Sequence, residues 1–224
     1  MKWAGLIAAV VAALSSWDPP GRRAAEARAI RPSDVANFDK LFSQNCSGCH
    51  GKDGQGALTV GIGRPAYLAI ADDATIRGTI EQGRPGTPMP AFAQRAGGML
   101  TETQIAILVH GIRNWATPGA FDHDDPPPYA ASHAGDAGHG REVFEAECSS
   151  CHGQDGRGAR AIADSSYLAL VTDQHLRTVM IVGMPNLGMP DWRGHVQPLT
   201  DGDVTDVVAW LASRRESLPA RVNP

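Results

Sequence analysis

The stretch Cys46-Ser47-Gly48-Cys49-His50 recurs as Cys148-Ser149-Ser150-Cys151-His152. Both copies follow the pattern C-x-x-C-H, which is typical of a c-type haem attachment site. Residues three apart share one side of a helical turn, so both thiols can join the two vinyl groups of one porphyrin. The next residue then presents an imidazole to the iron as its proximal ligand. We therefore predict two covalently bound haem c groups, attached through Cys46, Cys49, Cys148 and Cys151, with His50 and His152 as iron ligands.

Two other uses of paired cysteines fit the chain less well. A redox dithiol is expected within a βαβ unit, and neither pair lies in one. A zinc ribbon places its two pairs about 15–20 residues apart, whereas a far longer stretch separates Cys49 from Cys148. Neither alternative explains a histidine directly after both pairs. The chain contains 4 cysteines, so two haems would use every thiol.

Composition is consistent with small domains that need a prosthetic group. The 224 residues are 42% hydrophobic but only 6% aromatic. Two domains of about 90 residues each are near the lower end of comfortable core size, and a haem would supply the large apolar body that the sequence lacks. The net charge of −4 gives no indication of nucleic-acid binding. The acidic excess lies in the second half, where it can orient the approach of a partner or simply keep the domain soluble.

The N-terminal residues 1–29 are predicted to be a targeting or anchoring segment. Lys2 precedes an apolar stretch from Trp3 to Trp17, which Asp18-Pro19 interrupts. This length matches the apolar region of a signal peptide and is short for the roughly 30 Å hydrocarbon core of a membrane. We favour a signal peptide and keep an uncleaved anchor as the alternative. In both cases we expect an exported, periplasmic protein, soluble or tethered to the membrane.

Similarity between the two halves extends well beyond the cysteine motifs. Tyr67-Leu68-Ala69-Ile70 matches Tyr167-Leu168-Ala169-Leu170. Self-similarity of this kind indicates two copies of one domain. We place the domains at residues 30–118 and 137–224, and the Pro- and Asp-rich residues 119–136 form the linker. Further residues that match at one offset are Gly83, Pro85, Met89 and Pro90 with Gly183, Pro185, Met189 and Pro190.

Each copy is predicted to consist mostly of helices. A helix capped by Ser33 or Asp34 should lead into the first cysteine motif. A second helix covers residues 74–82, and a capping box begins the last helix at residues 101–115. The second copy should end in the same way, with a helix over residues 200–215.

Each copy also offers a sixth ligand for its iron. Methionine is a common distal ligand in cytochromes that carry electrons. Met89 and Met189 occupy equivalent positions, and the proline after each disfavours a helical conformation there. Met184 also precedes a proline, but the first copy has Arg84 at the aligned position. We therefore predict Met89 and Met189 as distal ligands, and Met99, Met180 and Met184 as core residues.

Together these motifs resemble class I cytochrome c domains, and the chain as a whole resembles the two-domain dihaem cytochromes c of bacterial periplasms. The resemblance covers about residues 33–215. It implies an all-α fold of two tandem domains, each wrapped around one covalently bound haem. In that family the helix before the haem crosses the last helix closely. We expect Phe38 to contact Gly111, and Gly140 to contact Trp210, in the two crossings.

The resemblance implies electron transfer by Fe(II)/Fe(III) cycling, in a bacterial respiratory or photosynthetic chain, with no catalytic residues. Redox proteins are the expected donors and acceptors, and neither nucleic acid nor a small-molecule substrate is expected. The alternative is a fixed haem subunit of a membrane quinol-oxidising or terminal oxidase complex. A dihaem peroxidase or sulfur-oxidising enzyme fits less well. A peroxidase needs one iron without a distal ligand, and the related sulfur enzymes often use a further cysteine.

We expect the chain to fold poorly without haem, because each domain is small and poor in aromatic residues. Protein produced without haem attachment should show no cooperative thermal transition, whereas the haem-loaded protein should melt sharply. Circular dichroism on both preparations measures the difference. A sharp cooperative melt of the haem-free protein would contradict this expectation.

Overall fold

The computed structural model describes residues 30–121, 124–158 and 160–215. The chain divides into a short unit, Met1–Asp34, and a main unit, Val35–Pro224. In the short unit the described residues form one 3-10 turn, η1 (Pro32–Asp34). The predicted targeting segment, residues 1–29, lies outside the described residues. Within the described ranges, no helix combines the length and the apolar character needed to cross a membrane.

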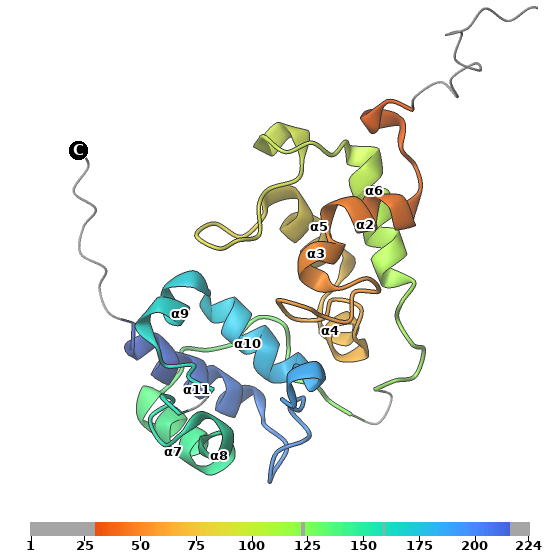
Figure 1. Cartoon of the computed structure of the whole chain (residues 1–224). Helices are drawn as coiled ribbons and strands as arrows, with labels where there is room; N and C mark the ends of the chain where they lie inside the picture. Colours follow the sequence, from red (N-terminus) through yellow and green to blue (C-terminus); the bar gives the residue numbers. More distant parts are fainter. Residues whose placement is uncertain (1–29, 122–123, 159, 216–224) are drawn as a thin grey trace, which may run out of the picture. The chain divides into compact units, whose positions relative to one another are not determined.

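The main unit is built from two series of helices in the same order (Figure 1). Among the described residues, β-type pairing is limited to two isolated bridges, Ala93 with Leu100 and Met184 with Met189. The fold is therefore all-α, as the sequence predicted. The first series is α2 (Phe38–Asn45), α3 (Ser47–His50), α4 (Pro65–Ile70), α5 (Asp73–Gln82), η2 (Gln94–Ala96) and α6 (Glu102–Arg113). The second series is α7 (Ala137–Glu147), α8 (Ser149–His152), α9 (Ser165–Leu170), α10 (Asp173–Val182), η3 (Pro185–Leu187) and α11 (Asp201–Ser213).

The last helix of each series begins with a capping box. Thr101 accepts a hydrogen bond from the backbone N–H of Gln104 at 3.2 Å, and the Gln104 side chain accepts one from the Thr101 N–H at 3.1 Å. Thr200 and Asp203 make the same reciprocal pair before α11. Each pair satisfies backbone donors that a helix start leaves free. The predicted capping box is confirmed.

The start of α2 differs from the prediction. Ser33 and Asp34 belong to η1, and the cap of α2 is Asn37, whose side chain accepts from the Lys40 N–H at 2.8 Å. The helix consequently begins at Phe38. Serine, aspartate and asparagine are all good helix caps, so local sequence does not decide between neighbouring candidates.

The first and last helices of the first series cross at a glycine. A Cβ atom built on Gly111 of α6 would lie 2.0 Å from Cδ2 of Phe38 on α2. The phenyl ring therefore fills the space that the missing side chain leaves. The predicted contact between Phe38 and Gly111 is confirmed.

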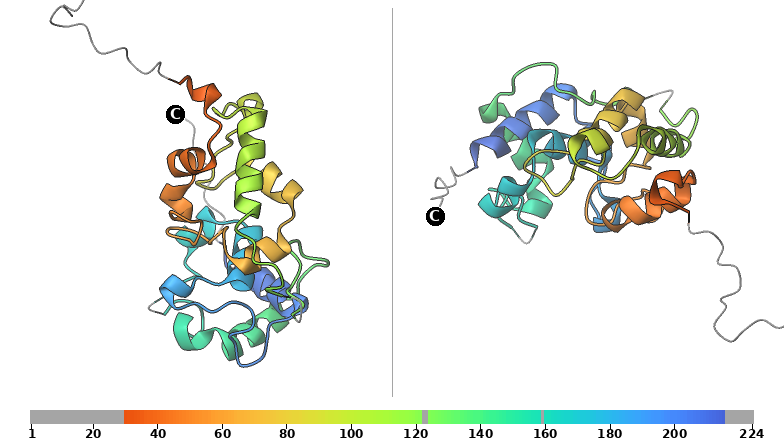
Figure 2. Two further views of the ribbon diagram at one scale, coloured as in Figure 1. Left: turned by 90° about the vertical axis from the view of Figure 1, so that its right-hand side faces the viewer. Right: turned by 90° about the horizontal axis from the view of Figure 1, so that it is seen from above.

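The second crossing uses a different partner from the predicted one. A Cβ atom on Gly140 of α7 would lie 1.9 Å from the carbonyl oxygen of Asp206 on α11. Gly140 thus meets the backbone of α11 one turn before Trp210, which instead packs on Phe144 with ring centroids 4.4 Å apart. The glycine lets the two helices lie side by side, as Figure 2 shows. The predicted pairing of Gly140 with Trp210 is corrected accordingly.

The predicted linker is held against the second series of helices. Arg177 of α10 has a side chain that is only 3% exposed. It donates to the backbone carbonyls of Pro128 at 2.7 Å and Tyr129 at 3.1 Å. The same guanidinium also donates to Thr205 at 2.9 Å and forms an ion pair with Asp201. A buried cation thus fixes the path of the linker, in addition to the stiffness that its prolines provide.

We expect Gly140→Ala to lower the free energy of unfolding by about 1–3 kcal/mol, because the new methyl group meets backbone atoms that cannot rotate away. Gly78→Ala on α5 is the matched control. Nothing lies within 4 Å of the Cβ position there, so that change should raise stability by about 0.5–1 kcal/mol. Denaturant unfolding of the haem-loaded protein measures both, and equal effects would contradict the close crossing.

Candidate haem-binding sites

The two cysteine motifs fold in the same way. Cys46 follows α2 as its C-cap, and the rest of the motif forms the single turn of α3. Cys148 stands in the same position between α7 and α8. Cys49 and Cys151 are exposed, and the two leading cysteines, Cys46 and Cys148, are half-buried. Before a haem is attached, burial raises the pKa of the Cys46 and Cys148 thiols to about 12.

A backbone carbonyl of the following loop orients each motif histidine. Nδ1 of His50 donates to the carbonyl of Val60 at 3.3 Å, and Nδ1 of His152 donates to that of Arg160 at 2.6 Å. A carbonyl only accepts, so the proton lies on Nδ1 and the lone pair of Nε2 is left for a metal. Burial lowers the pKa of His50, which favours the neutral imidazole that metal binding requires.

In the second domain three predicted haem-binding residues line one cavity. They are Cys148, His152 and Met189, and the cavity holds about 420 Å³ of space not filled by protein atoms, including its open mouth. A thiol, an imidazole and a thioether around an apolar slot are the groups that a c-type haem needs. The cavity therefore fits the predicted cofactor. Its other walls are Phe144, Ile162, Tyr167, Leu176, Val179, Met180, Val207 and Leu211.

The loops that contain the predicted distal methionines pass the preceding helix at a glycine. Gly183 ends α10 with φ 71°, and a Cβ atom there would lie 2.5 Å from the carbonyl oxygen of Pro190. Gly83 ends α5 with φ 64°, and its Cβ position is 2.5 Å from the carbonyl carbon of Pro90. Both loops are thus packed tightly onto the helix end, directly after the methionine. The same contact between a helix-ending glycine and the proline after the methionine therefore occurs in both domains, next to Met89 and next to Met189.

The three methionines that were predicted to be core residues differ in their burial and in the cavities that they line. Met184 exchanges two backbone hydrogen bonds with Met189, at 2.9 and 3.1 Å, but it lines a different, smaller pocket. Met180 is 6% exposed and forms part of the wall of the haem cavity. Met99 is 76% exposed, so its prediction as a core residue is wrong. It lies in the loop before α6, where its backbone position leaves the side chain at the surface.

Much of the apolar wall was not identified from the sequence. Tyr167 lines the cavity of the second domain, and its counterpart Tyr67 is 6% exposed in the first. Burial raises the pKa of both phenols, so both are neutral. A signal was available, because the same aromatic residue stands in the same short stretch of each repeat. Periodicity alone does not separate a residue that faces a cofactor from one that faces the protein core.

These features, two helical domains with a C-x-x-C-H turn and a methionine loop in each, define a dihaem c-type cytochrome. The family described as cytochrome c oxidase, cbb3-type, subunit III matches the chain twice, at residues 33–110 and 135–211. The chain belongs to this family. It contains two cytochrome c domains, and these hold two covalently bound haem c groups, as the sequence predicted.

Individual relatives are subunits of respiratory complexes. The chain is 31% identical to a cbb3-type cytochrome c oxidase subunit CcoP of Azospirillum sp. over 57% of this chain and 42% of that protein. It is 30% identical to a cytochrome bc1 complex cytochrome c subunit of Mycobacterium bovis, over 66% and 53%. It is 29% identical to the cbb3-type subunit FixPc of Rhizobium leguminosarum, over 79% and 61%. The chain spans about half the length of these curated relatives.

We expect Gly183→Ala to displace Pro190 and with it Met189, since the added methyl group would overlap the loop backbone. If Met189 is the distal ligand, as the sequence predicts, the red absorption band of methionine-ligated ferric haem should then be lost from the second domain. Gly188→Ala is the control: its φ of 74° gives the same backbone strain, but its nearest neighbour lies 3.6 Å away on a flexible arginine. Equal loss of the band in both variants would contradict the role of the close packing.

Proposed function

We propose that this chain transfers electrons through two haems, each ligated by a histidine and a methionine of its own domain. The pairs are His50 with Met89 and His152 with Met189. The observation that supports this most directly is the single cavity lined by Cys148, His152 and Met189. Each haem, when bound, supplies a one-electron Fe(II)/Fe(III) couple. The groups would be attached through Cys46 and Cys49, and through Cys148 and Cys151.

The side chains around the cavity favour electron transfer over catalysis. With one histidine and one methionine as its protein ligands, each iron would have no position left for a substrate. The hydrogen bond from Nδ1 of His152 to the Arg160 carbonyl holds the imidazole in one orientation. The thioether of a methionine raises the reduction potential, and the walls of the cavity are mostly apolar side chains. All four cysteines are assigned to attachment, so no thiol is left for the ligand set of a sulfur-oxidising enzyme. We therefore propose that the chain has no catalytic site.

A fixed place in a membrane respiratory complex is the second candidate. It is favoured by the relatives, which are named as subunits of cbb3-type oxidases and of a bc1 complex. In this proposal residues 30–118 and 137–224 are the haem domains outside the cytoplasm, and residues 1–29 provide export or a membrane anchor. Fractionation of native cells distinguishes the candidates. Release of the mature protein into the periplasmic fraction supports a free carrier, and co-purification with membrane oxidase or quinol-oxidising subunits supports a fixed one.

We expect Met89→Ala and Met189→Ala each to remove the red band of one haem and to lower the midpoint potential of that haem, because the thioether stabilises Fe(II). Imidazole should bind at the opened iron in each variant. Redox titration and absorption spectra of the haem-loaded protein measure these effects. Met99→Ala is the control, since that side chain is 76% exposed. A variant that keeps both bands would contradict the assignment of its methionine.

A further inference from the structure

Arg193 joins the distal loop of the second haem cavity to the linker. It follows Met189 closely along the chain, and its guanidinium lies between two carboxylates. Nη1 is 2.7 Å from Asp124 of the linker, and Nη2 is 2.7 Å from Asp191 of the loop itself. Nε of Arg193 also donates to Asp191 at 3.3 Å. One cation therefore bridges two segments that are far apart in sequence.

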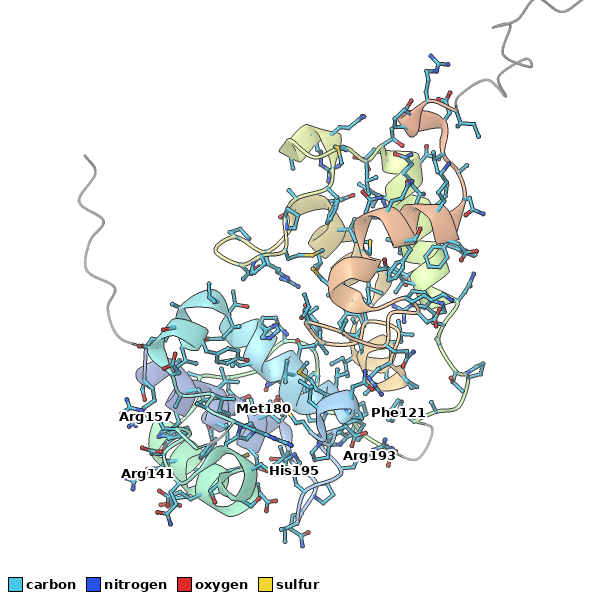
Figure 3. All side chains as sticks on the ribbon, in the orientation of Figure 1. Phe121, Arg141, Arg157, Met180, Arg193 and His195 are labelled. Carbon is cyan, nitrogen blue, oxygen red and sulfur yellow. The ribbon has the colours of Figure 1, made fainter. Side chains whose placement is uncertain are left out.

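Two aromatic rings complete this bridge. The guanidinium carbon of Arg193 lies 4.8 Å from the centroid of the Trp192 ring and 5.0 Å from that of Phe121. The two rings are 5.4 Å apart and inclined by 40°. Figure 3 shows Phe121 and Arg193 next to each other. We call Phe121, Asp124, Trp192 and Arg193 the linker clamp.

The linker clamp is attached to the backbone that positions Met189. Trp192 is 3% exposed, and its backbone N–H donates to the carbonyl of Ile181 on α10 at 3.3 Å. Its own carbonyl accepts from the N–H of Leu199 at 2.9 Å. Met189 lies three residues before Trp192. The loop between them packs against the end of α10, where Gly183 has no side chain in the way. A displacement of Trp192 would therefore move Met189 relative to α10.

The first domain has the same loop without the clamp. Phe92 stands in the place of Trp192 and donates to the carbonyl of Ile80 at 3.0 Å. Ala93 stands in the place of Arg193 and is completely buried. No side chain at that position can bridge to another segment.

Other arginines hold the first loop. Arg84 donates to the hydroxyl of Tyr129 in the linker and lies 6.0 Å from the centroid of its ring. Arg95 pairs with Glu81 of α5 at 2.5 Å and with Glu102 of α6 at 2.8 Å. The two distal loops therefore share a backbone path and differ in what holds them closed.

We propose that Phe121, Asp124 and Arg193 are positioning residues that hold the Met189 loop in place, so that Met189 stays within reach of the iron of the second haem. The inference rests on the proposed ligation by Met189. A single exposed ion pair contributes little. Here two ion pairs and two stacked rings act on one guanidinium, and cation–π contacts add to charge pairing. The combined effect of these contacts falls on the distal loop of the second domain.

The test compares imidazole binding to the ferric haem-loaded protein and its variants. In Arg193→Ala and Phe121→Ala we expect imidazole to bind about tenfold more tightly at the second haem, which corresponds to about 1.4 kcal/mol. Affinity at the first haem should not change. Arg193→Lys keeps the charge but loses the planar stacking group, so it should show a smaller effect. Signals from iron-bound methionine methyl groups in the ferrous protein, assigned with Met89→Ala, identify which ligand is lost.

The control is Arg141→Ala, which removes an exposed ion pair with Glu145 of 2.7 Å on α7, away from the loop. Asp124→Asn replaces Arg193→Ala should that variant fail to fold, because it removes only one ion pair. If Met189 is bound in the parent protein and neither clamp variant changes imidazole affinity, the clamp proposal is overturned alone. An equal change in Arg141→Ala also overturns it. If the parent protein shows no bound Met189, the ligation proposal fails first and the clamp proposal fails with it.

Discussion

The hydrogen bond between each motif histidine and a loop carbonyl is the constraint on which the proposed sites depend. It holds the imidazole of His50 against Val60 and that of His152 against Arg160. The loops that supply these carbonyls begin directly after the attachment turn, so the attachment and the orientation of the ligand are set by one short segment. The remaining helices then have to enclose a flat group in a fixed position. In the second domain, apolar side chains of these helices line the cavity. The loop that contains Met189 lies late in the domain sequence and contributes to the same cavity.

Local sequence was sufficient for the parts that depend on near neighbours. The attachment turns, the repeat and the capping boxes of α6 and α11 are set by residues a few positions apart, and all are present in the structure. The contact of Phe38 with Gly111 also followed, because complementary large and small residues stand at a crossing that the family shares. Met189 and His152 line the same cavity, in agreement with the position of Met189 in the repeat.

Features that depend on contacts between distant segments were not predictable in the same way. The glycine Gly140 is compatible with any close neighbour, and only the helix register shows that it faces Asp206. The proline and aspartate residues of the linker predict a stiff, polar connection. The attachment of the linker through the buried Arg177 is not predictable from sequence, because the acceptors are backbone carbonyls and every residue has one. Likewise, Arg193 in sequence is an ordinary surface cation, and only its position between Asp124 and Asp191 gives it a role.

The unequal helix crossings also bear on how the two copies have diverged. A duplicated pair of domains can be homogenised by recombination between its halves, which copies one sequence over the other. Here the first crossing needs a ring at Phe38 opposite Gly111, while the second needs no side chain at Gly140 because the backbone of α11 is in contact. A first helix transferred from the first half to the second would drive its ring into that backbone, and the reverse transfer would leave a void. The packing of each domain would thus oppose the exchange of a first helix between the two halves.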